Sequence, residues 1–75
     1  MNQTASPEIS VVVPVRDEAE NIDTLLAEIV AALAGRDFEI VYVDDGSADA
    51  TPACLAAARA RLPMLRVLRH RRSIG

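Results

Sequence analysis

The sequence lacks several residue types on which common kinds of protein site depend. It has no Lys and no Trp, a single Cys, a single His and two aromatic residues. Without Lys, neither a P-loop nor a receiver domain that relies on a lysine can be built. One Cys and one His cannot form an internal disulfide or a structural zinc site. With so few aromatic side chains, we do not expect nucleic acid to be a partner through base stacking.

Long apolar runs are also absent. The longest, residues 29–34, has six residues, far fewer than the roughly 18 of a membrane-spanning helix. No basic residue precedes Arg16 and the start has no apolar h-region, so we do not expect the N-terminus to be a signal peptide. The 75 residues, 51% of them hydrophobic and 25% charged, suit one small globular unit. We expect a flexible leader over residues 1–8 and a folded part over residues 9–75.

Charge is segregated along the chain. All eleven acidic residues lie within residues 1–50, together with two Arg, whereas residues 51–75 contain six Arg and no acid. The cluster Arg69, Arg71 and Arg72 with His70 has the charge to bind phosphate or another anion. The same cluster is more typical of a solvated segment, or of a segment that belongs to a larger structure.

Short β-branched runs predict three strands. Residues 9–15 and 38–43 are almost entirely apolar, which is typical of strands buried on both faces. Residues 65–68 predict a third, shorter strand. Because Pro14 cannot donate a hydrogen bond within a sheet, the first strand should end near it.

Two helices are expected between these strands. Apolar residues recur at helical spacing from Ile22 to Leu33, behind a group of acidic residues that suits the positive end of a helix dipole. Gly35 is expected directly past the C-cap, at C′. The second helix should contain Pro52 in its first turn and stop at Pro63. Its candidate N-caps are Ser47, Asp49 and Thr51, and Cys54 falls on its apolar side as a core residue.

The order strand–helix–strand–helix–strand predicts an α/β fold with a three-stranded parallel sheet, half of a Rossmann-like doubly wound domain. Ligands of such sheets bind outside the carboxyl ends of the strands. Here those ends carry residues 14–18, 43–49 and 69–75, which should converge on one edge of the sheet.

Several residues of this edge are candidates for ligand contacts. Asp44 and Asp45 are adjacent in an extended strand and should face opposite ways, so that one faces a ligand and the other braces the turn. The alternative is that both carboxylates only support the loop, because Asp-Asp-Gly is common in turns. Glu18 could bind a ligand or compensate a helix dipole. Pro14 could pack against the flat face of a base or simply end the strand. No glycine follows the first strand, so the dinucleotide fingerprint is excluded.

Two segments resemble the start of the family 2 glycosyltransferases, which have the GT-A fold and use nucleotide-diphospho-sugars. Residues 9–22, ISVVVPVRDEAENI, are similar to the family's S-V-V-I-P-x-Y-N-E-x-E-N-I. Residues 39–51, EIVYVDDGSADAT, are similar to its E-I-I-x-V-D-D-G-S-x-D-x-T. Residues 69–75 resemble the R-N-x-G that follows the third strand. The resemblance is nearest to the dolichol-phosphate mannose synthase-like branch.

The resemblance implies a nucleotide site on this chain. Its residues would be Pro14, Arg16 and Glu18 after the first strand, and Val43 and Asp45 after the second, with Asp44 either binding or bracing. Where the family often has Tyr-Asn, this chain has Arg16 and Asp17. A guanidinium can stack on a base in place of the aromatic ring, whereas Asp17 adds negative charge near a diphosphate and should weaken binding unless a neighbour holds it.

The resemblance also implies a D-x-D motif that holds Mg²⁺ or Mn²⁺ under the diphosphate, and a carboxylate base further on. Neither occurs in this sequence, so we expect no metal to be bound by this chain alone and no sugar transfer by it. The implied partners are a UDP- or GDP-sugar donor and a polyprenyl phosphate acceptor, with the full-length protein in the cytoplasm at the inner face of a membrane. The alternative is a non-catalytic α/β module that binds anions or proteins through its Arg-rich C-terminal segment. An exposed edge strand could also promote self-association.

Overall fold

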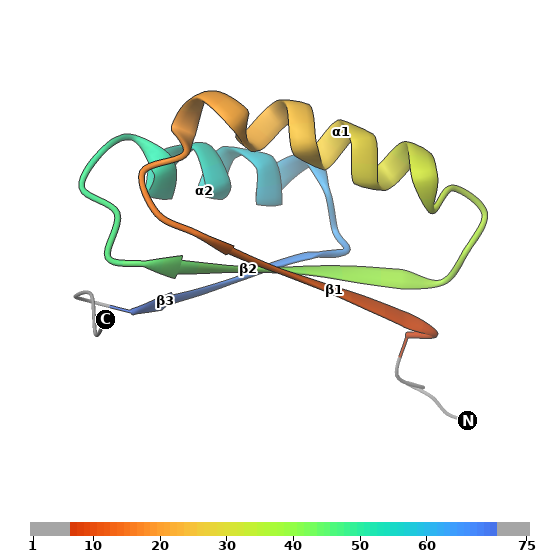
Figure 1. Ribbon diagram of the computed structural model, residues 1–75. Coiled ribbons are helices and arrows are strands. Elements are labelled where there is room, and N and C mark those ends of the chain that lie inside the picture. The colour runs from red at the N-terminus through yellow and green to blue at the C-terminus, as the bar shows by residue number, and fades with distance from the viewer. Residues whose placement is uncertain (1–6, 71–75) are drawn as a thin grey trace.

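The computed structural model describes residues 7–70 and contains three strands and two α-helices in that range (Figure 1). In chain order the elements are β1 (Ile9–Val15), the 3-10 turn η1 (Ala19–Asn21), α1 (Ile22–Ala32), β2 (Phe38–Asp45), α2 (Thr51–Arg61) and β3 (Leu65–His70). All strands are parallel, in the order β1-β2-β3. The predicted α/β fold class is confirmed. Most of the expected leader and the residues Arg71 and Arg72 lie outside the described residues.

The element boundaries differ from the predicted ones mainly at carboxyl ends. Strand β2 continues through both aspartates and β3 continues to His70, because each pairs with its neighbour over that length. Helix α1 ends at Ala32 with Leu33 as its C-cap, so the prediction that Gly35 occupies C′ is wrong by one residue. Gly35 has a positive φ of 85° in a turn closed by the N–H of Arg36 donating to the carbonyl of Leu33 at 2.9 Å. That backbone conformation favours glycine.

The start of α2 also differs from the prediction. Its N-cap is Ala50, which has no side-chain acceptor, rather than Ser47, Asp49 or Thr51. The carboxylate of Asp49 nevertheless accepts the N–H of Thr51 at 2.8 Å, so an otherwise free donor of the first turn is satisfied from one residue before the cap.

Both helices cover the same face of the sheet (Figure 1). Two consecutive right-handed crossovers that proceed in one direction along a sheet place their helices on one side. The core lies between the two layers and consists of Val15, Ile22, Leu26, Ile40, Tyr42, Leu55, Ala58 and Leu65. Cys54 packs against it, as predicted. Each α-helix has 11 residues, and the described part of the chain holds no helix with the length and apolar character to cross a membrane.

The opposite face of the sheet has no helix over it in the described range, although the strand sequences predict apolar side chains on both faces. Val12 is 62% exposed and Leu68 49% exposed on this face. A polar row crosses it: the Ser10 hydroxyl donates to Glu39 at 2.6 Å, and Arg66 pairs with Glu39 at 3.5 Å. We call this surface, which also carries Pro14, Val43 and Asp45 by strand alternation, the open face.

Among the described strands β1 pairs only with β2, so its other edge is free. The N–H of Ile9 donates toward the β2 side, to the carbonyl of Asp37 at 3.1 Å. Because N–H groups alternate in direction along a strand, those of Ser10 and Val12 point to the free edge. The nitrogen of Pro14 faces the same edge but has no hydrogen to donate. The edge therefore keeps two donors and carries no charged residue within the strand.

The free edge of β1 predicts self-association of this chain by strand pairing, because exposed, uncharged β-branched edges pair readily. We expect the sedimentation coefficient to rise with concentration, and Val12→Lys to reduce that rise because a charge would be placed at the pairing position. Ala31→Lys, on the exposed side of α1, is the matched control. A chain that sediments as a monomer at every concentration contradicts the prediction.

Candidate functional site

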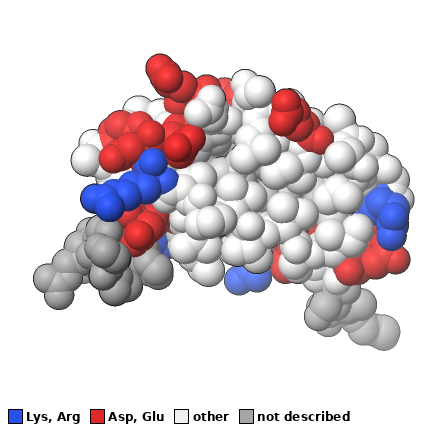
Figure 2. Space-filling model, viewed as in Figure 1, with Lys and Arg blue, Asp and Glu red and all other residues white. Residues whose placement is uncertain are grey.

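The candidate site lies where the three parallel strands end. The register pairs Val15 of β1 with Asp44 of β2, and Asp44 with Arg69 of β3. The loop that follows β1 and the loop that follows β2 are therefore neighbours, as the sequence predicts from the topology alone. Figure 2 shows acidic side chains gathered at this end of the molecule, with a basic side chain beside them.

The two aspartates that end β2 have different environments. Asp44 lies on the helix-covered face and is fully buried, whereas Asp45 is half-buried and belongs to the open face. One Asp44 oxygen accepts the N–H of Ser47 at 3.1 Å, and the other lies 3.6 Å from Nε of Arg69. Asp44 thus braces the turn and the end of β3, which is one of its two predicted roles.

Pro14 and Val43 lie side by side on the open face. The register makes them direct cross-strand partners, and Asp45 follows on the same face two residues after Val43. Three of the predicted site residues thus come together from two strands. They form an apolar surface that ends in a carboxylate, an arrangement that can hold a flat ring and accept a hydrogen bond from its edge.

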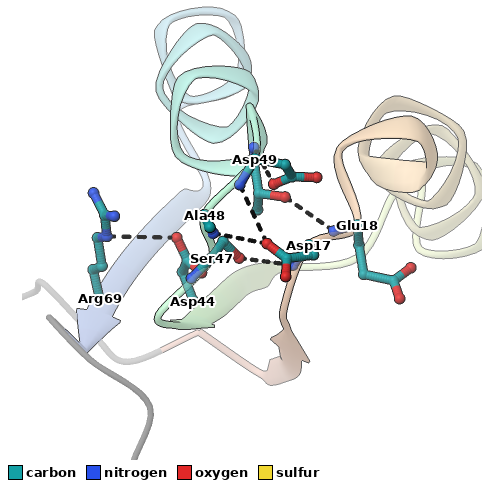
Figure 3. A network of polar contacts seen from close by, with 8 residues as sticks. Asp17, Glu18, Asp44, Ser47, Ala48, Asp49 and Arg69 are labelled. Atoms are coloured by element: carbon teal, nitrogen blue, oxygen red, sulfur yellow. Dashed lines mark hydrogen bonds and ion pairs between the residues drawn. The ribbon is translucent and has the colours of Figure 1, made fainter.

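Arg16 and Glu18 belong to the loop after β1, and both are exposed. The N–H of Glu18 donates to the Thr51 hydroxyl at 3.0 Å, while its carboxylate accepts from the Asn21 amide at 3.0 Å. In Figure 3 the Glu18 carboxylate points away from the hydrogen bonds that join the two loops. Its backbone is therefore fixed and its side chain remains open to solvent.

The two loops are joined through Asp17, to which the sequence analysis gave no structural role beyond its place among the acidic residues that suit a helix dipole. Its N–H donates to the Ser47 hydroxyl at 2.9 Å, and its Oδ1 accepts the N–H groups of Ala48 at 2.7 Å and Asp49 at 3.2 Å (Figure 3). The N–H of Ala19 donates to the Asp49 carboxylate at 3.3 Å. The charge of Asp17 is thus held by neighbouring backbone donors, the condition under which the sequence analysis expected it to be tolerated.

Sequence reasoning missed Asp17, Ser47 and Thr51 as the residues that join the loops. A signal was present: both loops are rich in residues whose short polar side chains bond to nearby backbone. That signal does not tell which loop each side chain will reach, because the partners are about thirty positions apart.

Burial and hydrogen bonding shift two pKa values near this end. Burial raises the pKa of Tyr42, whose hydroxyl has no hydrogen-bond partner among the described residues. Hydrogen bonds from the side chain and backbone of Thr51 lower the pKa of Asp49 below its ordinary 3.8. They do so because they favour the ionised carboxylate.

No three His, Cys, Asp or Glu side chains in residues 7–70 are grouped in a way that could hold a metal ion. Asp44 and Asp45 cannot act as a pair of ligands, because they lie on opposite faces of the sheet. A groove of about 280 Å³ does occur between the helices, lined by Asp23, Leu26, Ala27, Val30, Arg61 and Leu62. Its lining belongs to neither of the two loops.

The fold and this edge define an α/β protein of the class that binds ligands at the carboxyl ends of parallel strands. Residues 10–75 match the sequence profile of "Glycosyl transferase family 2". The chain belongs to this family, and the resemblance noted from its two motifs is confirmed.

Named relatives point to the same family. The chain is 44% identical over 52 residues to an undecaprenyl-phosphate 4-deoxy-4-formamido-L-arabinose transferase of Enterobacter sp. (strain 638), covering 67% of this chain and 16% of that protein. It is 46% identical over 43 residues to a dolichol-phosphate mannosyltransferase of Pyrococcus furiosus, covering 57% and 12% respectively. The chain thus spans less than a fifth of the length of these two relatives.

A solved structure is similar over nearly the whole chain. It is the mannosyltransferase PcManGT from Pyrobaculum calidifontis in complex with GDP-Man and Mn²⁺. The TM-score is 0.77 and the sequence identity 27%, with 96% of this chain and 22% of that chain covered. The three-stranded parallel sheet is therefore the GT-A type of Rossmann-like fold.

The lowered pKa of Asp49 predicts an acid-dependent loss of stability. Its contribution to folding is present above the unfolded pKa of about 3.8 and is lost as the pH falls through the lower folded value. We expect urea midpoints of the wild type to fall more between about pH 6 and about pH 3 than those of Asp49→Asn, which does not titrate. Parallel losses in the two proteins would contradict this assignment, because the remaining acidic groups are common to both.

Proposed function

We propose that this chain provides the nucleotide-binding edge of a glycosyltransferase that uses a nucleotide-diphospho-sugar donor. The observation that carries the proposal is the juxtaposition of Pro14 and Val43 across two strands, with Asp45 at the end of the same face. The family membership and the GDP-mannose bound by the mannosyltransferase of similar fold support this ligand class.

Each residue of the proposed site has a role that fits its environment. Pro14 and Val43 provide an apolar wall for the base, and the Asp45 carboxylate accepts a hydrogen bond from a base N–H. The exposed Glu18 carboxylate accepts hydrogen bonds from the ribose hydroxyls. The Arg16 guanidinium stacks on the base or forms an ion pair with the phosphates of the nucleotide. Asp44, which is buried beneath the helices, supports this edge from within.

The acceptor we propose for the whole protein is a polyprenyl phosphate. The names of two relatives, one an undecaprenyl-phosphate and the other a dolichol-phosphate sugar transferase, support this acceptor class. Such an acceptor is a membrane lipid, so the proposal places the reaction of the whole protein at a membrane surface, on its cytoplasmic side.

The first test is a titration of the 75-residue chain with GDP and UDP, followed by amide NMR. We expect amide shifts over residues 15–18 and 43–49, and a dissociation constant about tenfold weaker for Asp45→Asn, because the hydrogen-bond acceptor loses its charge. Glu28→Gln removes the same charge from the exposed side of α1 and should leave the affinity unchanged. Shifts confined to residues 69–75 would instead favour an anion-binding module built on the Arg-rich segment.

Sugar transfer needs more than these residues. Mg²⁺ or Mn²⁺ is expected in the full-length enzyme, and the Mn²⁺ in the related mannosyltransferase complex supports that expectation. The described acidic residues of this chain do not fit such a site, since no three of them are grouped. A divalent ion neutralises the charge of a departing nucleotide diphosphate, so we infer that the chain alone does not catalyse transfer.

A transfer assay with radiolabelled GDP-mannose, Mn²⁺ and a polyprenyl phosphate tests this inference. The 75-residue chain should give no product above the rate without protein. Turnover above that background would contradict it, and the expectation that a metal site and a base lie outside this sequence would then be wrong.

A further inference from the structure

Asp17 has a backbone conformation that the chain uses nowhere else among its described non-glycine residues. Its φ is +52°, in the left-handed region. Most residues avoid this region because Cβ approaches the carbonyl oxygen, whereas Asn, Asp and Gly tolerate it best. Such a conformation persists where surrounding contacts compensate for it. It turns the chain sharply two residues after β1 ends.

The compensating contacts all reach the other loop. Asp17 uses one donor and one carboxylate oxygen to make three hydrogen bonds, to Ser47, Ala48 and Asp49. The next two N–H groups also donate to residues that follow β2: that of Glu18 to Thr51, the first residue of α2, and that of Ala19 to Asp49. Five hydrogen bonds therefore join two segments that are some thirty residues apart in sequence.

Ser47 connects this set of bonds to the buried end of the sheet. Its hydroxyl accepts from Asp17 while its own N–H donates to Asp44, which in turn pairs with Arg69. Asp44 is fully buried, and within residues 7–70 its second oxygen has no hydrogen-bond partner besides the ion pair at 3.6 Å. A continuous series of contacts thus runs from the loop after β1, through β2, to β3 (Figure 3).

We propose that Asp17 is a positioning residue for nucleotide binding: it fixes the loop that carries Arg16 and Glu18 against the loop that follows Asp45. This inference rests on the function proposed above. Its physical basis is that a site assembled from two independent loops must lose their conformational freedom when a ligand binds, which weakens the affinity. Asp17 removes that freedom before the ligand arrives, and its Oδ1 acts by accepting backbone N–H groups of the other loop rather than by contacting the ligand.

Three substitutions separate the backbone effect from the hydrogen bonds. Asp17→Asn keeps both the tolerance for positive φ and an oxygen that can accept from Ala48 and Asp49. Asp17→Gly keeps only the backbone conformation, and Asp17→Ala keeps neither. Asp23→Ala, which removes an exposed acid of α1 that pairs with Arg61, is the control for loss of an acidic group.

The experiment measures GDP affinity by titration, together with amide exchange of Ala48 and Asp49 in the free protein. We expect Asp17→Asn and Asp23→Ala to bind within about threefold of the wild type. Asp17→Gly should bind about tenfold more weakly and exchange both amides faster, and Asp17→Ala should be weaker again. Urea unfolding of each variant identifies any that fails to fold. The comparison of the Gly and Asn variants, which share the backbone conformation, then carries the test.

Three outcomes distinguish the possible failures. If the wild type binds neither GDP nor UDP, the proposed function is wrong and the positioning role is lost with it. If the wild type binds and Asp17→Gly binds equally well, nucleotide binding stands and the positioning role of Asp17 is wrong. Equal loss of affinity in Asp17→Asn and Asp17→Gly would also overturn it, because the retained oxygen would then have no effect.

Discussion

The structure of the candidate site depends on hydrogen bonds between the loop after β1 and the loop after β2. Neither loop belongs to a helix or strand over most of its length, so its N–H groups need acceptors from elsewhere. Asp17, Ser47, Asp49 and Thr51 supply these acceptors reciprocally. The residues proposed to contact the nucleotide gain defined positions from this pairing, although their own side chains take little part in it.

Because side chains alternate along a strand, the two adjacent aspartates at the end of β2 face opposite sides of the sheet and have different roles. Asp44 points beneath the helices, where a turn N–H and an arginine offset much of the cost of burying it. Asp45 points to the open face, next to the apolar row of Pro14 and Val43. One dipeptide thus gives the edge both an internal support and a carboxylate able to meet a ligand.

In the described range one face of the sheet has no helix over it and one edge of β1 has no neighbouring strand. Both features are consistent with the finding that this chain spans only a small part of the length of its relatives. Strands with apolar residues on both faces are normally covered on both sides in α/β proteins. Here the described helices cover one side, and Val12 and Leu68 remain exposed on the other. The local sequence is therefore that of a sheet buried on two faces, while the observed burial is one-sided.

The sequence by itself determined the element order, the parallel topology and the family, since short β-branched runs alternate with a helical period and the two motifs are specific. It also located the edge that holds Pro14, Glu18 and Asp45, because parallel strands share a carboxyl end. Only the tertiary structure decided which aspartate is buried and which loop each short polar side chain binds. Local pattern specifies that Asp17, Ser47 and Thr51 seek backbone donors or acceptors. The partner, some thirty residues away, is chosen only when packing brings the two loops together.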